Sequence, residues 1–597
     1  IVRYMVENSL GRLWLEGHPN AELHDGWKYY LDEAEQEPEV EAQLAKLREE
    51  YTTIKPEEIK VIDPCMGSGH ILVYAFDVLM QIYTSAGWDQ REAAQSILKN
   101  NLYGLDIDDR AAQLAYFAVM MKARQYDRRL LTRGIQPNIF SIRESYGIQA
   151  MTIEYFHKND TKLKADIESI ITEMRDAKEY GSILNITPVD FDGLYARFDE
   201  IRNDINMMQM SALDELLPLV KCAEVLAKKY DVVVTNPPYM AVSNAGAKVN
   251  DYVKKNFPDS KADMFAVFIE RCGQMAKKNG YQAMITQHAW MFLSSFEKLR
   301  TKLLAVDIVN MAHLGARAFE EIGGEVVQTT SFVIRKSHIA DYKGEYCRLI
   351  EPTSQQGKED MFLAGENRYM ADQSNFSKIP GSPVAYWVSE GLIGAFQNVL
   401  LYNYSTSPSQ NVTGNNGKYV RKHWELCNKI IGGKDAWIFY AKGGGYRKWW
   451  GNLDDVVNWT PEARKVYQFG DGHHASQIIN KEYWYKQGIT WGLITTNIPS
   501  FRVMPEGATY DKGGSTIIVA PEVYSFTMGL LNSKVYIEIA AMLNPTLNFQ
   551  VKDVRSMPLV LDNCDAISDT VNKNIIMSKA DWDSYETSWD FKRNPLV

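Results

Sequence analysis

The sequence predicts an α/β fold built on a mostly parallel sheet, and two observations lead to this prediction. From Lys60 onward, short apolar segments end in polar or glycine residues, and amphipathic helical segments lie between most of them. Such alternation implies parallel strands with helices on both faces of one sheet. The segments expected to form strands are 61–62, 102–105, 232–234, 283–285, 308–312 and 332–334.

The same pattern divides the chain into three expected regions. Residues 1–60 are polar and predicted to be helical, with Val40, Leu44 and Leu47 at helical spacing. Residues 61–340 hold the strand–helix alternation, with a mainly helical insertion at about 140–230. Residues 341–597 contain more glycine, asparagine and aromatic residues and few clear helices, which predicts a second domain of mixed α/β structure.

Composition excludes several classes of protein. The chain has 597 residues, of which 45% are hydrophobic and 23% charged, as in globular proteins and unlike disordered or fibrous ones. No apolar stretch approaches the roughly 20 residues that span a bilayer, so we expect no membrane association. The six cysteines form no CxxC pair and the ten histidines no HExxH pattern, so we expect a reduced, cytoplasmic protein without a metal. The chain begins with Ile1 rather than Met, and we expect it to be part of a longer protein.

The distribution of charge favours a local nucleic-acid surface. The formal net charge of −10 by itself argues against a nucleic-acid partner. Residues 411–515, however, hold 14 Lys and Arg against 9 Asp and Glu, a balance of 14 − 9 = +5, and are rich in aromatic residues. Such a stretch in an acidic protein is a candidate DNA-binding region; the alternative is an ordinary domain with a Trp-rich core.

A glycine-containing loop follows the first expected strand. The segment Asp63-Pro64-Cys65-Met66-Gly67-Ser68-Gly69 runs from that strand into a helical pattern. Glycines let the backbone turn tightly and approach a ligand closely. An acidic residue at the carboxyl end of a strand lies where α/β sheets bind ligands. It repels phosphate but suits a ligand with a positively charged amino group, such as S-adenosylmethionine (SAM). The pattern predicts a Rossmann-like cofactor site, with a plain strand–helix turn as the alternative.

The next expected strand ends on Asp106, which Ile107 follows. A carboxylate in this place can accept hydrogen bonds from both ribose hydroxyls of a nucleoside cofactor. Ile107 could then pack against the adenine of that cofactor. A solvated strand end is the alternative interpretation.

The most specific feature is the segment Asn236-Pro237-Pro238-Tyr239, which follows an apolar run. Two prolines fix the backbone and remove two donors, so carbonyl acceptors remain. The Asn236 side-chain oxygen and the Pro237 carbonyl can accept both hydrogens of an exocyclic amine. Tyr239 offers a flat face on which a flipped base can stack. Asn-Pro is also a common turn opening, which is the alternative for this segment alone.

In this order, the three motifs resemble those of the amino-directed DNA methyltransferases of the N6-adenine group. Segments 286–292, 442–452 and 543–550 resemble a narrower set. That set is the PglX family of methyltransferases from BREX phage-defence systems, together with related single-chain (type IIG) restriction-methylation enzymes. The resemblance covers most of the chain. It implies a SAM-dependent methyltransferase domain at 61–340 and a DNA target-recognition domain at 341–597.

The resemblance also implies roles for individual residues. The residues implied to hold SAM are Asp63, Pro64, Cys65, Met66, Gly67, Gly69, Asp106 and Ile107. Asn236, Pro237, Pro238 and Tyr239 are implied to be catalytic, and Phe319 is a candidate for the opposite face of the target base. Candidates for phosphate or guanine contacts are Lys442, Arg447, Lys448 and Arg502. The family's third-strand acidic contact has no match here, although 182–184 marks its place.

The activity implied is site-specific methylation of adenine N6 in double-stranded DNA, for modification of host DNA in a phage-defence system. Other proteins of a defence complex and DNA-mimic inhibitors are expected partners. Three alternatives remain open. They are a restriction-methylation enzyme whose nuclease lies outside this sequence, a methyltransferase of glutamine side chains or RNA, and a SAM-regulated DNA-binding specificity subunit.

Overall fold

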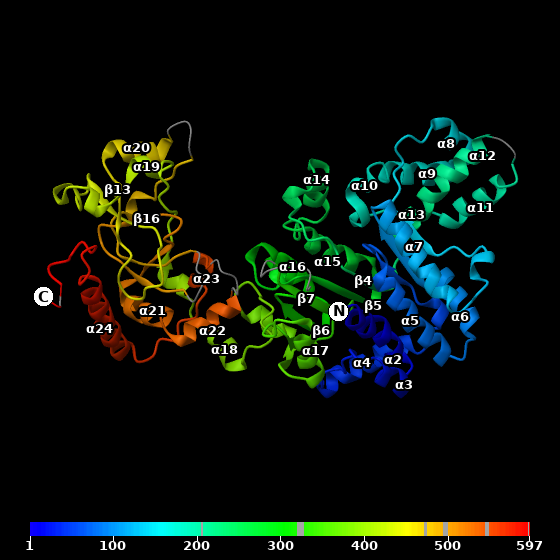
Figure 1. Ribbon diagram of the computed structural model, residues 1–597, viewed down its shortest axis with the longest axis horizontal. Helices are drawn as coiled ribbons and strands as arrows, with labels where there is room; N and C mark the ends of the chain where they lie inside the picture. The colour runs from blue at the N-terminus through cyan, green and yellow to red at the C-terminus, as the bar shows by residue number, and fades with distance from the viewer. Residues whose placement is uncertain are drawn as a thin grey trace. The chain divides into compact units, whose positions relative to one another are not determined.

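The computed structural model describes residues 1–204, 207–318, 327–470, 475–493, 499–543, 549–594 and 596. They form two compact units, Ile1–Phe376 and Ser377–Val597 (Figure 1). The division falls after residue 376 rather than near residue 340. The reason is that two further strands beyond residue 340 join the sheet of the first unit.

The first unit is built on a nine-stranded sheet in the order β3-β2-β1-β4-β5-β7-β6-β8-β9. Its strands are β1 (Val61–Asp63), β2 (Leu102–Asp106), β3 (Asn138–Ser141), β4 (Tyr230–Thr235), β5 (Ala276–Gln287), β6 (Asp307–Gly315), β7 (Thr329–Arg335), β8 (Lys343–Arg348) and β9 (Arg368–Asp372). The five strands from β3 to β5 are parallel, and β7 runs antiparallel to both of its neighbours. The predicted α/β fold with a mostly parallel sheet is therefore confirmed.

All six predicted strands are present, and the apolar runs explain why. Val232, Val233 and Val234 are completely buried in β4, as expected for a central parallel strand covered on both faces. The sequence did not reveal β3, β8 and β9. These strands lie near the edges of the sheet. The residues of β9 are exposed or half-buried throughout, so hydrophobic periodicity does not mark that strand.

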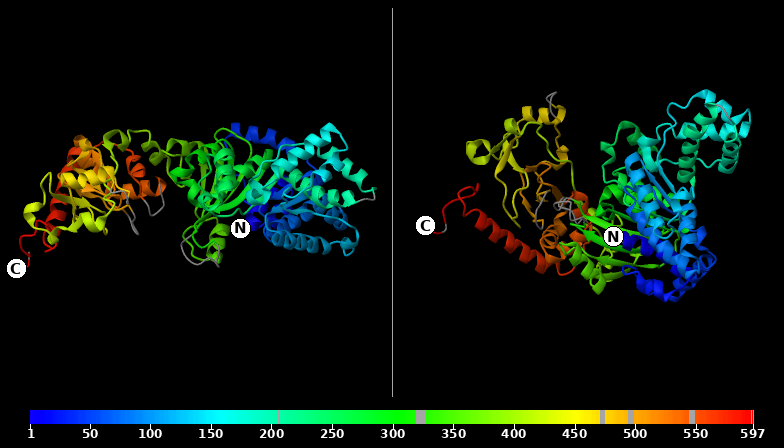
Figure 2. Two further views of the ribbon diagram at one scale, coloured as in Figure 1. Left: turned by 90° about the horizontal axis from the view of Figure 1, so that it is seen from above. Right: turned by 45° about the vertical axis from the view of Figure 1, so that its right-hand side comes forward.

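Helices cover both faces of this sheet. They are α1 (Val2–Val6), α2 (Arg12–Gly17), α3 (Ala21–Gly26), α4 (Pro38–Tyr51), α5 (His70–Ser85), α6 (Gln90–Ser96), α7 (Asp109–Arg124), α14 (Ala247–Asn256), α15 (Met264–Met275), α16 (Glu297–Leu303) and α17 (Gln355–Ala364). The predicted helical insertion comprises α8 (Ala150–His157), α9 (Thr161–Glu173), α10 (Ala177–Tyr180), α11 (Phe191–Ile201), α12 (Met207–Ser211) and α13 (Leu217–Ala227). Both views in Figure 2 show its cyan and teal helices as a lobe at one end of the unit.

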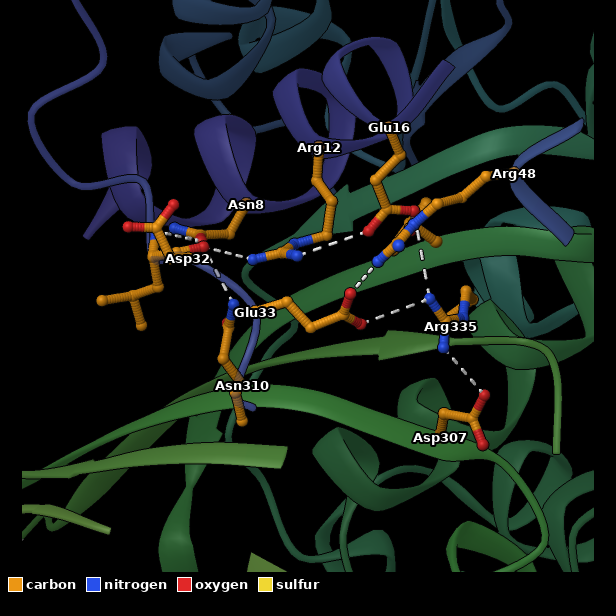
Figure 3. Close-up of polar contacts among 12 residues, drawn as sticks. Asn8, Arg12, Glu16, Asp32, Glu33, Arg48, Asp307, Asn310 and Arg335 are labelled. Atoms are coloured by element: carbon orange, nitrogen blue, oxygen red, sulfur yellow. Dashed lines mark hydrogen bonds and ion pairs between the residues drawn. The ribbon is translucent and has the colours of Figure 1, made fainter. Parts of the chain in front are cut away.

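The N-terminal helices share one hydrophobic core with the sheet, and buried ion pairs also link them to it (Figure 3). Arg12 and Arg335 both pair with Glu16, at 3.3 and 3.9 Å. Arg335, on β7, also pairs with Asp307, on β6, at 3.2 Å. Each of these four side chains is at most 6% exposed. Residues 1–51 are thus an integral layer of the first unit.

The second unit contains two four-stranded sheets, ordered β10-β17-β14-β15 and β11-β13-β12-β16. Their strands are β10 (Ser405–Thr406), β11 (Val420–Lys422), β12 (Trp437–Ala441), β13 (Asp455–Asn458), β14 (Gly488–Thr490), β15 (Arg502–Met504), β16 (Thr509–Tyr510) and β17 (Thr516–Val519). The helices are α18 (Glu390–Ala395), α19 (Asn416–Tyr419), α20 (Pro461–Phe469), α21 (Tyr524–Leu531), α22 (Lys534–Leu543), α23 (Val551–Arg555) and α24 (Cys564–Trp582). The combination of short strands and helices confirms the predicted mixed α/β domain, although helices are more frequent than the sequence indicated.

Candidate active site

The three sequence motifs follow β1, β2 and β4, which are adjacent parallel strands. Their loops therefore meet at one edge of the sheet, at the carboxyl ends of the strands. The chain passes from β1 to β2 on one side and later returns to β4 on the other, so the strand order reverses between β1 and β4. Open α/β sheets bind ligands in the crevice at such a point. The structure thus brings the predicted cofactor and catalytic motifs together.

The conformation of the glycine loop is fixed by its glycine backbone angles and by hydrogen bonds to β2. Gly67 and Gly69 have φ angles of +52° and +84°, which favour glycine. The Gly67 amide donates to the Asp106 carboxylate at 2.9 Å, and the Met66 amide to the Leu105 carbonyl at 3.1 Å. A Cβ on Gly67 would meet nothing within 4 Å, whereas one on Gly69 would lie 2.9 Å from the Ala115 Cβ. The loop therefore packs against α7 at Gly69 and leaves space in front of Gly67.

Asp63, at the end of β1, is buried with one carboxylate oxygen free. Its Oδ1 accepts hydrogen bonds from the Thr235 hydroxyl at 2.7 Å and from the Cys65 amide at 3.1 Å. Its Oδ2 has no partner, although the residue is only 1% exposed. Burial raises the pKa of Asp63 to about 7, against the opposing hydrogen bonds from Thr235 and Cys65. A buried oxygen without a donor is costly unless a ligand supplies one.

Asp106 and Ile107 lie beside this loop. The Asp106 carboxylate accepts from the amides of Gly67 and Asp108, both at 2.9 Å, and each oxygen keeps a further lone pair for a ligand. Ile107 is 53% exposed, so a ligand beside the loop could pack against it. These features together fit SAM. The free Asp63 oxygen suits its amino group, the open glycine loop its methionine part, and the exposed Ile107 its adenosine.

The segment 182–184 does mark a place beside the cofactor loop, but not as a strand. Residues Gly181–Ile183 form a short 3-10 turn in which the Ser182 hydroxyl donates to the Pro64 carbonyl at 2.5 Å. Buried Arg271 fixes the turn by donating to the carbonyls of Ser182 and Leu184. The third strand itself is β3, at 138–141. No acidic side chain comes from this turn, in line with the missing family contact.

The Asn236–Tyr239 segment directly follows β4, and its polar residue, Asn236, is exposed. Asn236 and Pro238 are exposed, Pro237 is buried and Tyr239 is half-buried. The Tyr239 hydroxyl donates to the Ile285 carbonyl at 3.2 Å, and its ring meets Phe265 edge-on at 6.3 Å. The ring orientation is thus fixed from both sides, and burial raises the pKa of its hydroxyl. The Asn236 amide is available to a ligand. Phe319, the candidate for the base's other face, lies outside the described residues.

Arg502, one of the basic residues predicted to contact DNA, is internal. Only 1% of Arg502 is exposed, and its guanidinium donates to the Gly443 carbonyl in loop 442–452. Burial lowers the pKa of Arg502 to about 10. Arg502 therefore supports this loop from within the second unit rather than presenting charge at its surface.

Arg447, in the same loop, has partners inside the unit. It donates to the Trp450 carbonyl at 3.0 Å and pairs with Asp581 at 2.6 Å. Its guanidinium lies 4.8 Å from the ring centre of Trp582, so both α24 and the loop hold it. About a quarter of the side chain, 23%, remains exposed.

The exposed part of this loop is its aromatic tip. Lys448 donates to the Asn532 carbonyl at 2.7 Å and Lys442 is half-buried, whereas Tyr446 is 61% exposed. Gly443 and Gly444 have φ angles of +89° and +106°, which lets the loop turn sharply before the tyrosine. Tyr446 was not among the residues predicted to contact DNA, because those were chosen for positive charge within a region already noted as rich in aromatic residues. Sequence reasoning also missed Thr235, although its position directly before Asn236 was a signal.

Comparisons with known proteins find similar sequences over the whole chain. Residues 100–319 match the Eco57I restriction-modification methylase family. The whole chain is 37% identical to the adenine-specific methyltransferase BrxX of Escherichia coli O9:H4 (strain HS). It is equally similar, at 37%, to the adenine-specific methyltransferase PglX of Lacticaseibacillus casei (strain Zhang). The chain spans about half the length of these curated relatives, 52% of each.

The fold also matches a solved structure. The Type IIL restriction-modification enzyme MmeI, solved in complex with DNA, superposes with a TM-score of 0.53 at 10% sequence identity. The match covers all of this chain and 72% of that one. Among the described residues, no helix is both long and apolar enough to cross a membrane.

Proposed function

Because this chain is a relative of the BrxX and PglX adenine-specific methyltransferases, we propose that it methylates N6 of adenine at a specific site in double-stranded DNA. The proposal includes SAM as methyl donor and modification of host DNA in a BREX-type phage-defence system. One observation carries it. The open glycine loop with its buried carboxylate and the exposed Asn236 amide lie on adjacent strands at one edge of the sheet.

In this proposal, the loops after β1 and β2 hold the cofactor. The free Oδ2 of Asp63 accepts from the cofactor's amino group, and Asp106 accepts from its ribose hydroxyls. Gly67 leaves room for close approach, while Ile107 covers the adenine. Bound SAM supplies a methyl group on a positively charged sulfonium, which needs no covalent enzyme intermediate.

The segment after β4 holds the target amine. The Asn236 side-chain oxygen and the Pro237 carbonyl accept its two hydrogens, which leaves the nitrogen lone pair free to face the cofactor. Tyr239, with its ring fixed by Ile285 and Phe265, stacks on the flipped adenine. Stacking on an aromatic ring contributes roughly 1–3 kcal/mol per base and offsets part of the cost of flipping. The catalytic contribution of these residues is orientation and charge stabilisation.

The second unit, in this proposal, recognises the DNA site. Its region 411–515 has the +5 balance noted above, in a chain of net charge −10. Within loop 442–452, the internal contacts of Arg447 and Arg502 preorganise the exposed Tyr446, which we infer touches DNA. Lys442, Arg447 and Lys448 remain candidates for phosphate contacts through their exposed parts. The other proteins of the defence system are proposed partners. DNA-mimic inhibitors would compete with DNA for the same surface. Because the proposed substrate is host DNA, we place the protein in the cytoplasm.

The proposed function is tested by sequencing modified bases in genomic DNA. Cells that express the intact parent system are compared with cells that carry Asn236→Ala. We expect N6-methyladenine at one fixed motif, lost in the variant. Absence of a motif-specific mark in both strains would overturn the proposal and favour a DNA-binding role or another substrate.

A further inference from the structure

Thr235 joins the cofactor loop to the catalytic segment. It is the last residue of β4, is completely buried, and directly precedes Asn236. Its hydroxyl donates a 2.7 Å hydrogen bond to Oδ1 of Asp63, the last residue of the neighbouring strand β1. The register of the two strands, with Ile62 opposite Val233, places both residues at the same edge of the sheet. One hydrogen bond thus spans the point where the strand order reverses.

This bond controls which way the Asp63 carboxylate faces. Oδ1 receives two donors, the Thr235 hydroxyl and the Cys65 amide, whereas Oδ2 receives none. Two donors on one oxygen fix the rotation of the carboxylate and leave the other oxygen for a ligand. A threonine suits this task because its branched Cβ restricts the side chain to few rotamers. Without the hydroxyl, Oδ1 keeps the Cys65 amide alone.

We propose that Thr235 is a positioning residue that holds Asp63 ready for the amino group of the cofactor and thereby couples cofactor binding to Asn236. The inference rests on the proposed function, since it takes SAM as the ligand. Thr235 itself touches neither cofactor nor target base; it acts through Asp63.

The electrostatics of the pair give the proposal a pH signature. Asp63 must be ionised to bind a protonated amino group, so affinity is present above its pKa and lost as the pH falls through it. Burial raises this pKa to about 7, the Thr235 and Cys65 donors lower it, and the charge of Asp106 raises it. The thiols of Cys65 and Cys272 face the same carboxylate and stay neutral, because burial raises their pKa values. Removing the Thr235 hydroxyl therefore raises the pKa of Asp63. The loss of SAM affinity at low pH, the acid limb of the binding profile, then moves to higher pH.

The test measures SAM affinity by isothermal titration calorimetry between pH 5.5 and 9 on the purified chain. Thr235→Val removes the hydroxyl at nearly constant shape, and Thr235→Ser keeps it. We expect Thr235→Val to weaken SAM binding by about tenfold or more at neutral pH, with the acid limb displaced upward, and Thr235→Ser to bind like the wild type. Val234→Ala, a buried change one residue earlier in β4, controls for general loosening and should leave the acid limb in place.

The outcomes separate this inference from the proposed function. Thr235→Val binding with wild-type affinity and pH dependence, while Asp63→Ala loses binding, would overturn the role of Thr235 and leave the methyltransferase proposal standing. Absence of SAM binding by the wild-type chain would overturn both. Circular dichroism checks folding. If Thr235→Val does not fold, Thr235→Ala takes its place, with the same displaced acid limb expected and an unmoved limb contradicting the inference.

Discussion

Arg335 and Asp307 form an ion pair of 3.2 Å in which neither side chain is exposed to solvent. Arg335 also faces Glu16 at 3.9 Å and Glu33 at 4.0 Å. One guanidinium therefore interacts with carboxylates from both the sheet and the N-terminal helical layer. Breaking a buried pair by removing one partner leaves an uncompensated charge and typically costs about 3–5 kcal/mol.

We therefore expect Arg335→Met to lower the free energy of unfolding by at least about 3 kcal/mol. Urea denaturation followed by circular dichroism measures this. Arg202→Met is the matched control, because its pair with Asp199 leaves both side chains more than half exposed, at 58% and 69%. That change should cost less than about 1 kcal/mol. Equal effects of the two changes would contradict the importance of the buried network.

Asn236→Ala should abolish methylation and spare cofactor binding. The Asn236 amide is exposed at the end of β4 and supports neither the glycine loop nor the core. Losing an oriented acceptor for the target amine should lower the methylation rate by roughly a hundredfold or more. Tritiated methyl transfer to DNA measures the rate, and calorimetry measures SAM affinity.

Asn236→Asp serves as the matched control, because a carboxylate oxygen can also accept from an amine. It should retain more activity than Asn236→Ala. Loss of SAM binding in the alanine variant would show that Asn236 belongs to the cofactor site instead.

The buried carboxyl of Asp63 should make the unliganded chain less stable as the pH rises. Its pKa is raised from the ordinary value of 3.8 to about 7. The native state therefore holds a proton that the unfolded state releases between these values, and the associated stability is lost as the pH rises through 7. Asp63→Asn removes this dependence. The stability difference between variant and wild type should shift by up to about 4 kcal/mol in favour of the variant between pH 4 and pH 8.

Urea denaturation at both pH values gives this difference. The other ionisable groups are the same in both proteins, so their contributions to stability cancel. The exposed change Asp199→Asn should show a shift below about 0.5 kcal/mol. Asp63→Asn should at the same time bind SAM poorly at every pH. A pH-independent stability difference would mean that Asp63 is not a buried acid of raised pKa.

Tyr446→Ala should weaken DNA binding without destabilising the chain. The tyrosine is 61% exposed on a loop that internal contacts hold in place. Loss of one aromatic contact to DNA should cost roughly 1–3 kcal/mol of binding free energy. Fluorescence anisotropy with a duplex that contains the recognised site measures the loss.

Tyr585→Ala is the matched control, since Tyr585 is 57% exposed elsewhere in the second unit. It should bind DNA like the wild type. Arg502→Met should behave differently from both, because a buried guanidinium that supports Gly443 is lost and thermal stability falls. Normal DNA binding by Tyr446→Ala would exclude the loop tip from the interface.

The sequence predicted the strands that position the candidate site, because apolar runs such as 232–234 are completely buried and carry a local signal. It could not predict β9, whose residues are half-buried or exposed and which is recognisable only from its pairing with β8. The glycine loop and the Asn236–Tyr239 motif were visible because both are contiguous in sequence. The bond between Thr235 and Asp63 was not, since it joins residues 172 positions apart. Arg502 was misjudged because its charge is visible in sequence and its burial is not.

The place of β8 and β9 has a consequence for building chimeras that exchange the second unit. Both strands lie beyond residue 340 in sequence but belong to the nine-stranded sheet of the first unit. A graft joined at 340 would strip them away and leave β6 as a bare edge, open to pairing with other chains. A graft joined between Phe376 and Ser377 exchanges the second unit whole and keeps the sheet that carries the candidate active site intact.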